Sequence, residues 1–373
     1  LEDTANADAG AVFVYQLVLG SYSLAQGIFP PAPVAFGYFG ESVGIDGSWL
    51  AVGSPGHGPG GRVIPHYSFD GIWTPQPILL RPGTDELGSA LTLQGTDLLV
   101  GDYSDDDLGP NAGAVHYWEL SLTSPSYITK IYAPDGLTGD QFGYSLDLDD
   151  NWLVVGAWLA NDGGVNSGTA YVFRRDSLPV DPWVTFEYRQ ELQPCGNHDY
   201  ATFGRSVSVQ GERVAVGAPG GSFAGQLGGF VTVYDFGGFG DPQHNWTTTI
   251  YPEDGSDDDR FGLSTAILGE YLVTGAPRVD EAAPNCGAAY MVSTTSSAVF
   301  GGECPCATLA TIESYGAGKP GTNGVPELTM NKPPVPGDST MMGLYDILPG
   351  TAPVLLWGLT QAEIPFDGGT LLM

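Results

Sequence analysis

The sequence predicts an all-β protein built from repeated sheets, and three observations lead to this prediction. One stretch of 17 residues recurs five times without a gap. Gly (55 residues) and Pro (29) are abundant, whereas charged residues make up only 15% of the 373; this mix disfavours long helices and favours strands joined by turns. Apolar residues alternate with other residues in the first half of each copy, which is the period of a strand.

The recurring stretch reads FGYSLDLDDNWLVVGAW from Phe142, and each copy predicts a β-hairpin. The other copies begin at Phe39, Leu87, Phe203 and Phe261, so successive starts lie 48, 55, 61 and 58 residues apart. Turn residues and a closing glycine mark the two ends of the second strand, where we expect a tight turn and a close approach of backbones. The turns are Asp46-Gly47, Gln94-Gly95, Asp149-Asp150, Gln210-Gly211 and Leu268-Gly269, and the glycines are Gly53, Gly101, Gly156, Gly217 and Gly275.

Two further strands complete each repeat. A third strand begins at Gly113, Gly168, Gly229 and Gly287 in the last four copies, after a loop of variable length. A more variable fourth segment, such as YITKIYAP from Tyr127, leads into the next copy. Four strands per repeat of this length form the blade of a β-propeller, so we expect a propeller of four-stranded blades.

The order of FG, a strand, GAP and a glycine-led aromatic strand resembles the FG-GAP repeat. That repeat builds the N-terminal propeller of integrin α-subunits and occurs in many secreted bacterial proteins. The resemblance covers about residues 1–293 and implies an extracellular or cell-surface β-propeller. It does not imply an activity, because one fold serves many functions.

The two ends of the chain depart from the repeat. The opening residues LEDTANADAGAVFVYQL align with LANDGGVNSGTAYVFRR from Leu159, in the middle of a repeat. We therefore expect a partial first blade, whose missing hairpin is removed, unseen or supplied by another chain, and we favour six blades over seven. Residues 1–300 are predicted to form the propeller and 301–373 a small, incomplete C-terminal β module. Short apolar runs between Pro and Gly indicate this module, which resembles the start of a β-domain on some secreted bacterial repeat proteins.

Charge and cysteine content narrow the partners and the compartment. The formal net charge is −31, from 43 acidic against 12 basic residues, which excludes nucleic acid and anionic lipid as partners. The chain contains no run of 18 apolar residues, so we expect no membrane span. An even number of cysteines in such a chain favours disulfides and secretion. The candidates are Cys195, Cys286, Cys304 and Cys306, and a Cys195–Cys286 bridge would join neighbouring blades.

Loops rich in oxygen ligands are the candidate metal sites. Blade topology places the loop between strands two and three on the same face as the link to the next blade, so we expect acidic residues to gather there. Ca²⁺ takes six to eight oxygen ligands from such loops; alternatively, these side chains form Asx-turns and solvated surface. The candidates are Asp105, Asp106, Asp107 and Asn111; Asn161, Asp162 and Asn166; and Asp254, Asp257, Asp258 and Asp259. The integrin-type calcium loops cannot be transferred, because only a two-residue turn stands at their position.

No residue is assigned a catalytic role. Ser42 lies in a GxSxG pattern typical of hydrolases, but serine recurs at its register as Ser145, Ser206 and Ser264. A serine repeated around a ring favours a structural role, and we expect it to bond to the backbone. The five histidines show no spacing pattern of a ligand set or catalytic group.

These observations lead to one preferred function and two alternatives. We expect a secreted, calcium-binding β-propeller without enzyme activity, acting as an adhesion or structural subunit. It would associate with other chains, including copies of itself, by strand or edge pairing, and this could extend into a fibre or surface lattice. One alternative is a lectin-like module that binds extracellular glycans through Trp158, Tyr103 and Trp49. The other is the non-catalytic part of a larger secreted enzyme.

Overall fold

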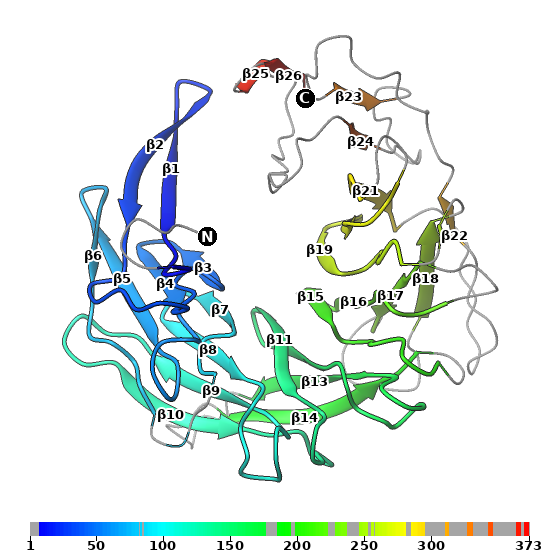
Figure 1. The fold of residues 1–373 in the computed structure, drawn as a ribbon, viewed down its shortest axis with the longest axis horizontal. Helices are drawn as coiled ribbons and strands as arrows, with labels where there is room; N and C mark the ends of the chain where they lie inside the picture. Colours follow the sequence, from blue (N-terminus) through cyan, green and yellow to red (C-terminus); the bar gives the residue numbers. More distant parts are fainter. Residues whose placement is uncertain are drawn as a thin grey trace. The chain divides into compact units, whose positions relative to one another are not determined.

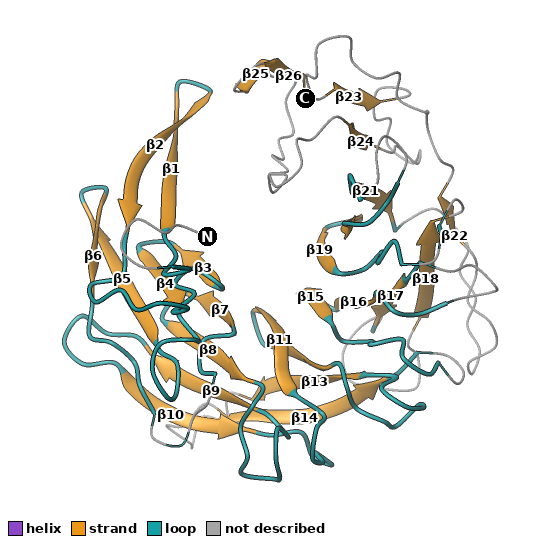
Figure 2. Cartoon of the chain, viewed as in Figure 1, coloured by secondary structure: helices purple, strands orange, loops and turns teal. Residues whose placement is uncertain are grey.

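The computed structural model describes a chain of strands and loops. It describes residues 7–294 except 82, 84–85, 177–184, 195–197, 223–227, 237–245, 253–254, 257 and 281–284. Beyond residue 294 it describes five strands between residues 310 and 372. Within these described residues Figure 2 shows strands and loops but no helix, so none is present there that could span a bilayer. The predicted all-β class is confirmed.

The chain divides into two compact units, one of Leu1–Tyr15 with Leu24–Glu212 and one of Gln16–Ser23 with Arg213–Met373. The first unit holds three four-stranded antiparallel sheets in which neighbouring strands follow the order of the sequence (Figure 1). Their strands are β3 (Val43–Asp46), β4 (Trp49–Gly53), β5 (Val63–Phe69) and β6 (Ile72–Pro75); β7 (Ala90–Gln94), β8 (Asp97–Asp102), β9 (Ala114–Glu119) and β10 (Ser126–Ile131); and β11 (Phe142–Asp149), β12 (Trp152–Ala157), β13 (Thr169–Asp176) and β14 (Thr185–Leu192).

The remaining strands flank these three sheets in the sequence. A two-stranded sheet precedes them, formed by β1 (Val12–Val18) and β2 (Ser21–Ile28), and β15 (Ser206–Gln210) follows them. In the second unit, β17 (Phe230–Asp235) pairs antiparallel with both β16 (Arg213–Ala218) and β18 (Trp246–Pro252), and β22 (Ala310–Ile312) pairs parallel to β18. A three-stranded sheet contains β19 (Ser264–Leu268), β20 (Tyr271–Ala276) and β21 (Ala288–Ser293). Two hairpins follow: β23 (Glu327–Met330) with β24 (Met342–Tyr345), and β25 (Glu363–Phe366) with β26 (Gly369–Leu372).

The hairpins of the repeat form where the sequence predicts them, but each turn lies one residue later. Asp46 pairs with Trp49, so the first strand continues through Asp46 and the two-residue loop is Gly47-Ser48. Gln94, Asp149 and Leu268 likewise pair with Asp97, Trp152 and Tyr271. The prediction located the residue with positive φ correctly, at 55° for Gly47 and 50° for Asp150, but that residue opens the loop.

Successive sheets are joined through their backbones. A Cβ atom on Gly53, Gly101 or Gly156 would lie against the carbonyl oxygen of Gly88, Gly143 or Gly204, the FG glycine of the next repeat. The recurring serine secures the same carbonyl, because Ser42 Oγ donates to Gly88 O at 2.7 Å and Ser145 Oγ donates to Gly204 O at 2.8 Å. The predicted close approach and the structural role of this serine are both confirmed at these positions.

Apolar side chains fill the space between neighbouring sheets. Phe142 is fully buried and belongs to one core cluster with Leu99 and Val115 of the sheet before it and with Tyr171 of its own sheet. Phe39, Phe203 and Phe261 are buried to the same degree, as expected for residues that pack between blades. β1 and β2 form a two-stranded sheet, and the partial first blade stays a prediction. The number of blades and the domain division at residue 300 stay predictions.

Gly156→Ala tests the backbone contact. The added methyl group meets a carbonyl oxygen that cannot move without shifting the next sheet, so we expect the free energy of unfolding to fall by about 1–3 kcal/mol. Gly136→Ala is the control, because its Cβ would come no closer than 3.3 Å to the side chains of Ala133 and Leu108 and 3.4 Å to the Ala133 carbonyl oxygen, and should change stability by less than about 0.5 kcal/mol. Denaturant unfolding measures both; equal effects would contradict the proposed constraint.

Candidate metal-binding sites

The acidic loops between the second and third strands contain the same type of hydrogen bond. It occupies a side-chain oxygen that could otherwise bind a metal ion. A side-chain oxygen accepts the backbone N–H of an asparagine five residues later, and that asparagine has a φ near 50°. The pairs are Asp106–Asn111, Asn161–Asn166 and Asp280–Asn285, with N···O distances of 2.7, 2.9 and 2.6 Å. These side chains therefore shape the loop, which supports the alternative of Asx-type turns for them.

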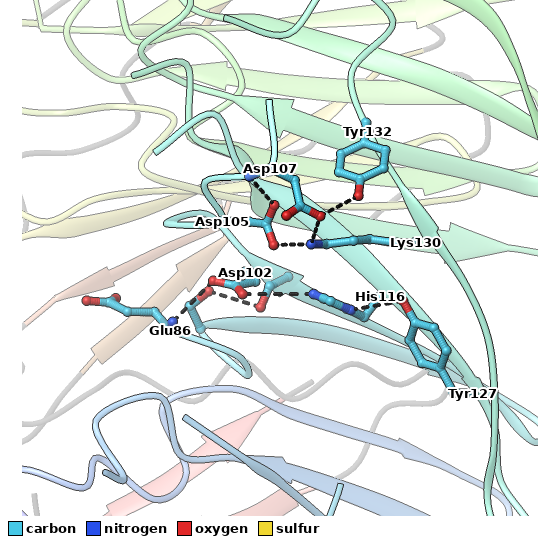
Figure 3. A network of polar contacts seen from close by, with 10 residues as sticks. Glu86, Asp102, Asp105, Asp107, His116, Tyr127, Lys130 and Tyr132 are labelled. Atoms are coloured by element: carbon cyan, nitrogen blue, oxygen red, sulfur yellow. Dashed lines mark hydrogen bonds and ion pairs between the residues drawn. The ribbon is translucent and has the colours of Figure 1, made fainter. Parts of the chain in front are cut away.

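In the second repeat the predicted metal group Asp105, Asp106, Asp107 and Asn111 does not form one cage. Lys130 of β10 contacts the Asp105 carboxylate and lies 2.7 Å from Asp107 Oδ2, and the Tyr132 hydroxyl also donates to Asp107 at 2.7 Å (Figure 3). The hydrogen bonds from Lys130 and Tyr132 hold the pKa of Asp107 below its usual value. Although burial opposes the charge of Lys130, its bonds to Asp105 and Asp107 raise its pKa. An ammonium group thus already neutralises part of this loop.

The same region contains a buried cluster that the sequence did not reveal. Asp102, at the end of β8, and His116, in β9, join Asp105, and one ligand atom of each lies within 4.8 Å of the others. Their exposed fractions are 0%, 2% and 1%. A signal was present in the alignment of the copies: Asp102 stands where the other repeats have Ser54, Ala157, Ala218 and Ala276, so a carboxylate replaces a small residue at a buried register.

In the third repeat three carboxylates converge, from Asp135, Asp162 and Glu191. Asp135 accepts the Tyr171 hydroxyl at 2.9 Å, and Asp162 accepts the Thr169 hydroxyl at 3.1 Å. Burial and then the charges of Asp162 and Asp135 raise the pKa of Glu191. In the described part of the chain no ion pair joins these three carboxylates to a lysine or arginine.

Only one of the predicted residues of the third repeat belongs to this cluster. Asp162 contributes a carboxylate, whereas Asn161 and Asn166 form the loop hydrogen bond. Glu191 was missed because it lies in a strand, β14, where it pairs with Tyr171. The metal candidates predicted from the sequence lie in loops, although alternation along a strand also brings every second side chain to one face.

In the acidic group before the fifth hairpin, the described residues Asp258 and Asp259 already bond to other groups of this chain. Asp258 accepts Arg260 Nε at 3.0 Å and also contacts Arg278, and Asp259 accepts the backbone N–H of Ser256 at 2.8 Å. The arginine hydrogen bonds lower the pKa of Asp258. Asp254 and Asp257 lie outside the described residues.

Of the four cysteines predicted to form disulfides, the structure describes one. Cys286 is a free thiol that donates to Val279 O at 3.3 Å. Cys195, Cys304 and Cys306 lie outside the described residues, so their pairing stays a prediction.

The aromatic residues considered for glycan binding fall into two groups. Tyr103, Tyr144 and Trp158 form a row with ring centroids 5.4 and 5.1 Å apart. The Arg205 guanidinium lies 4.1 Å from the ring centre of Tyr144 and 4.9 Å from that of Trp158, where it covers stacking surface. Trp49 is buried in the core and packs against Tyr67, so it cannot stack on a sugar.

Lys130→Met tests whether the ammonium group is an essential part of the second-repeat network. Removing it leaves the buried Asp105 carboxylate without its cation, and we expect the free energy of unfolding to fall by about 3 kcal/mol. Arg189→Met is the matched control, because the Arg189–Glu187 pair is solvent-exposed, with an N···O distance of 3.3 Å, and such pairs contribute less than about 1 kcal/mol. Urea unfolding of both variants measures the two changes in free energy. A loss for Lys130→Met no larger than that for the control would contradict this role of Lys130.

Comparison with known proteins identifies the repeat. The FG-GAP repeat model matches residues 126–173 and 246–292. Each match begins in a fourth strand, β10 or β18, and continues through the next hairpin to a third strand, β13 or β21. Comparison with curated proteins found no matching sequence. The chain therefore contains FG-GAP repeats, and its four-stranded antiparallel sheets are those of β-propeller blades.

Proposed function

We propose that the chain is an extracellular structural or adhesion subunit that associates with other chains and has no catalytic activity of its own. FG-GAP repeats are typical of extracellular proteins. The observation that carries the proposal is an apolar sheet face, at the first complete blade, that is more exposed than its counterparts among the described residues.

Each first strand presents two apolar side chains toward the preceding blade. In β7 these are Leu91 and Leu93, which lie against Gly44 of β3 and are each 9% exposed. The equivalent pairs in the next two repeats, Leu146–Leu148 and Val207–Val209, are buried to the same extent. In β3 the equivalent residues are Val43 and Ile45, which are 52% and 59% exposed.

The arrangement of the strands explains this difference. β7 packs against β3 and β4, and β11 packs against β7 and β8, so each first strand is covered by the first two strands of the blade before it. β3 follows a two-stranded sheet, β1–β2. Val12 and Val14 of β1 pack against the cluster that contains Leu50 and Val52, and their cover does not extend to Val43 and Ile45.

β1, which precedes β3 in the chain, offers an unpaired edge among the described strands. Third strands such as β5 pair with a strand on each side, whereas β1 pairs only with β2 among the described strands. An open edge beside an apolar face can take a strand of another protein chain, with backbone hydrogen bonds and side-chain burial acting together. A second copy meeting this face through its own would give an isologous interface.

Val43→Lys combined with Ile45→Lys tests this association. Sedimentation velocity over a concentration series should show reversible association of the native chain, and the double variant should shift the distribution to the monomer. Leu137→Lys is the control, because Leu137 is also exposed, at 65%, but lies in a loop away from β3. Equal association of all three proteins, or a native chain that stays monomeric throughout, would overturn the proposed interface.

Calcium is the second part of the proposal, and it is supported by the cluster of Asp135, Asp162 and Glu191. These three carboxylates converge, and in the described part of the chain no basic side chain offsets their mutual repulsion. Ca²⁺ accepts several carboxylate oxygens in a flexible arrangement. Its binding would connect the link before β11, the loop after β12 and β14 of the same blade.

Calcium-dependent melting tests this site. At a Ca²⁺ concentration 100 times the dissociation constant, binding stabilises the folded state by about 2.7 kcal/mol, so we expect Tm to rise by several degrees and to return on chelation. Asp135→Asn with Asp162→Asn should abolish the rise. Asp106→Asn should keep it, because an asparagine side chain can still accept the Asn111 N–H. A rise that survives the double substitution would exclude these carboxylates as the site.

A further inference from the structure

The cluster of Asp102, Asp105 and His116 has a geometry different from the calcium candidate. Each of the three side chains uses one polar atom in an orienting hydrogen bond. Asp102 Oδ1 accepts the Glu86 N–H at 3.1 Å, Asp105 Oδ1 accepts the Asp107 N–H at 3.1 Å, and His116 Nδ1 lies 3.3 Å from the Tyr127 hydroxyl. The second oxygen of Asp102 faces His116 Nε2, and the second oxygen of Asp105 contacts Lys130 (Figure 3), while one ligand atom of each of the three side chains lies within 4.8 Å of the others.

Two of these atoms have no hydrogen-bond partner within the described residues. They are Asp102 Oδ2 and His116 Nε2, which lie 3.8 Å apart. Both belong to side chains that are almost completely buried. A buried polar atom without a partner costs free energy, and a carboxylate oxygen costs more than a neutral group. This arrangement therefore indicates a ligand between the carboxylate and the imidazole.

The charge of the surroundings favours a cation. Asp102, Asp105 and Asp107 supply three carboxylates, while Lys130 is the ammonium group that contacts Asp105 and Asp107. Asp107 lies at the surface and can retain Lys130 when Asp105 binds an ion. A ligating carboxylate oxygen can also keep a hydrogen bond from outside the coordination sphere, as it does in many metal sites.

The donor set selects the class of ion. One imidazole nitrogen with two carboxylate oxygens suits a first-row divalent transition metal, of which Zn²⁺ binds tightly and needs only three or four ligands. Ca²⁺ takes six to eight oxygens and gains little from an imidazole. The contact of His116 Nδ1 with a hydroxyl is the outer-shell support that fixes the ring and leaves Nε2 free to bind.

We propose that Asp102, Asp105 and His116 form a binding site for a divalent transition-metal ion, with Zn²⁺ as the preferred occupant. The ion would link the ends of two neighbouring strands to the loop that joins them, since Asp102 ends β8, Asp105 lies in the loop and His116 lies in β9. It would act within a single blade and independently of calcium.

Titration calorimetry of Zn²⁺ into the full chain in calcium-containing buffer tests the site. We expect one equivalent to bind, and His116→Gln or Asp102→Asn to weaken binding by more than tenfold. His66→Gln is the matched control: His66 is equally buried in β5, but its Nδ1 lies 3.0 Å from the Ile64 carbonyl oxygen, and it belongs to no acidic cluster in the described part of the chain. Its loss should leave Zn²⁺ binding unchanged.

Cobalt provides a readout that does not depend on stability. Co²⁺ bound by one imidazole and two carboxylates should give visible absorption bands that Zn²⁺ displaces, and Asp135→Asn with Asp162→Asn should retain them. Bands that persist in both His116→Gln and Asp102→Asn would overturn the proposal, as would Zn²⁺ binding that is absent from the native chain or unaffected by both substitutions.

Discussion

The contact between backbones of successive repeats is the constraint on which the rest of the structure depends. Gly53, Gly101 and Gly156, which end second strands, each lie against the glycine carbonyl that opens the next repeat, so there is no room for a side chain between them. This distance sets how closely two sheets approach, and the buried phenylalanine and the apolar residues of the first strands fill the space that remains. The hydroxyls of Ser42 and Ser145 then donate hydrogen bonds to two of these buried carbonyls.

Because this frame is fixed by backbone and small residues, the loops that leave it are free to vary. Three loops keep the same hydrogen bond from an asparagine N–H, yet their charges are balanced in different ways. Lys130 serves the second repeat and two arginines serve Asp258 in the fifth. The third repeat has no such partner for its three carboxylates among the described residues. The net charge of −31 is therefore not spread evenly over the surface. Some acidic loops have a basic partner and others do not.

The features that could be predicted from the sequence are those that recur with a constant register. Three features recur along the chain: the alternation seen at Val207 and Val209, the serine at the register of Ser42, and the glycine that ends the second strand. Because they recur, several copies support the same interpretation. The contacts of single side chains do not repeat. Lys130 reaches Asp105 from a different strand across a distance in sequence that no pattern encodes, and Glu191 joins Asp162 because of strand pairing. The predicted turn was one residue too early. The residue types show where a positive φ is needed, but they do not show which residues form the last pair of the hairpin.

Departures from the repeat are accordingly more informative about function than the repeat itself. Asp102 replaces a small residue at a register where every other copy has serine or alanine, and a buried carboxylate there is costly unless it has a partner. His116 stands at the position of Tyr171 in the following repeat, and both side chains meet carboxylates: Tyr171 through its hydroxyl, His116 through a ring nitrogen. The exchange of tyrosine for histidine turns a hydrogen-bond donor into a metal ligand while the strand position stays the same. The second repeat therefore holds a mixed nitrogen and oxygen set suited to a transition metal, whereas the third repeat holds an oxygen-rich cluster suited to calcium, and the two sets draw on different positions of the blade.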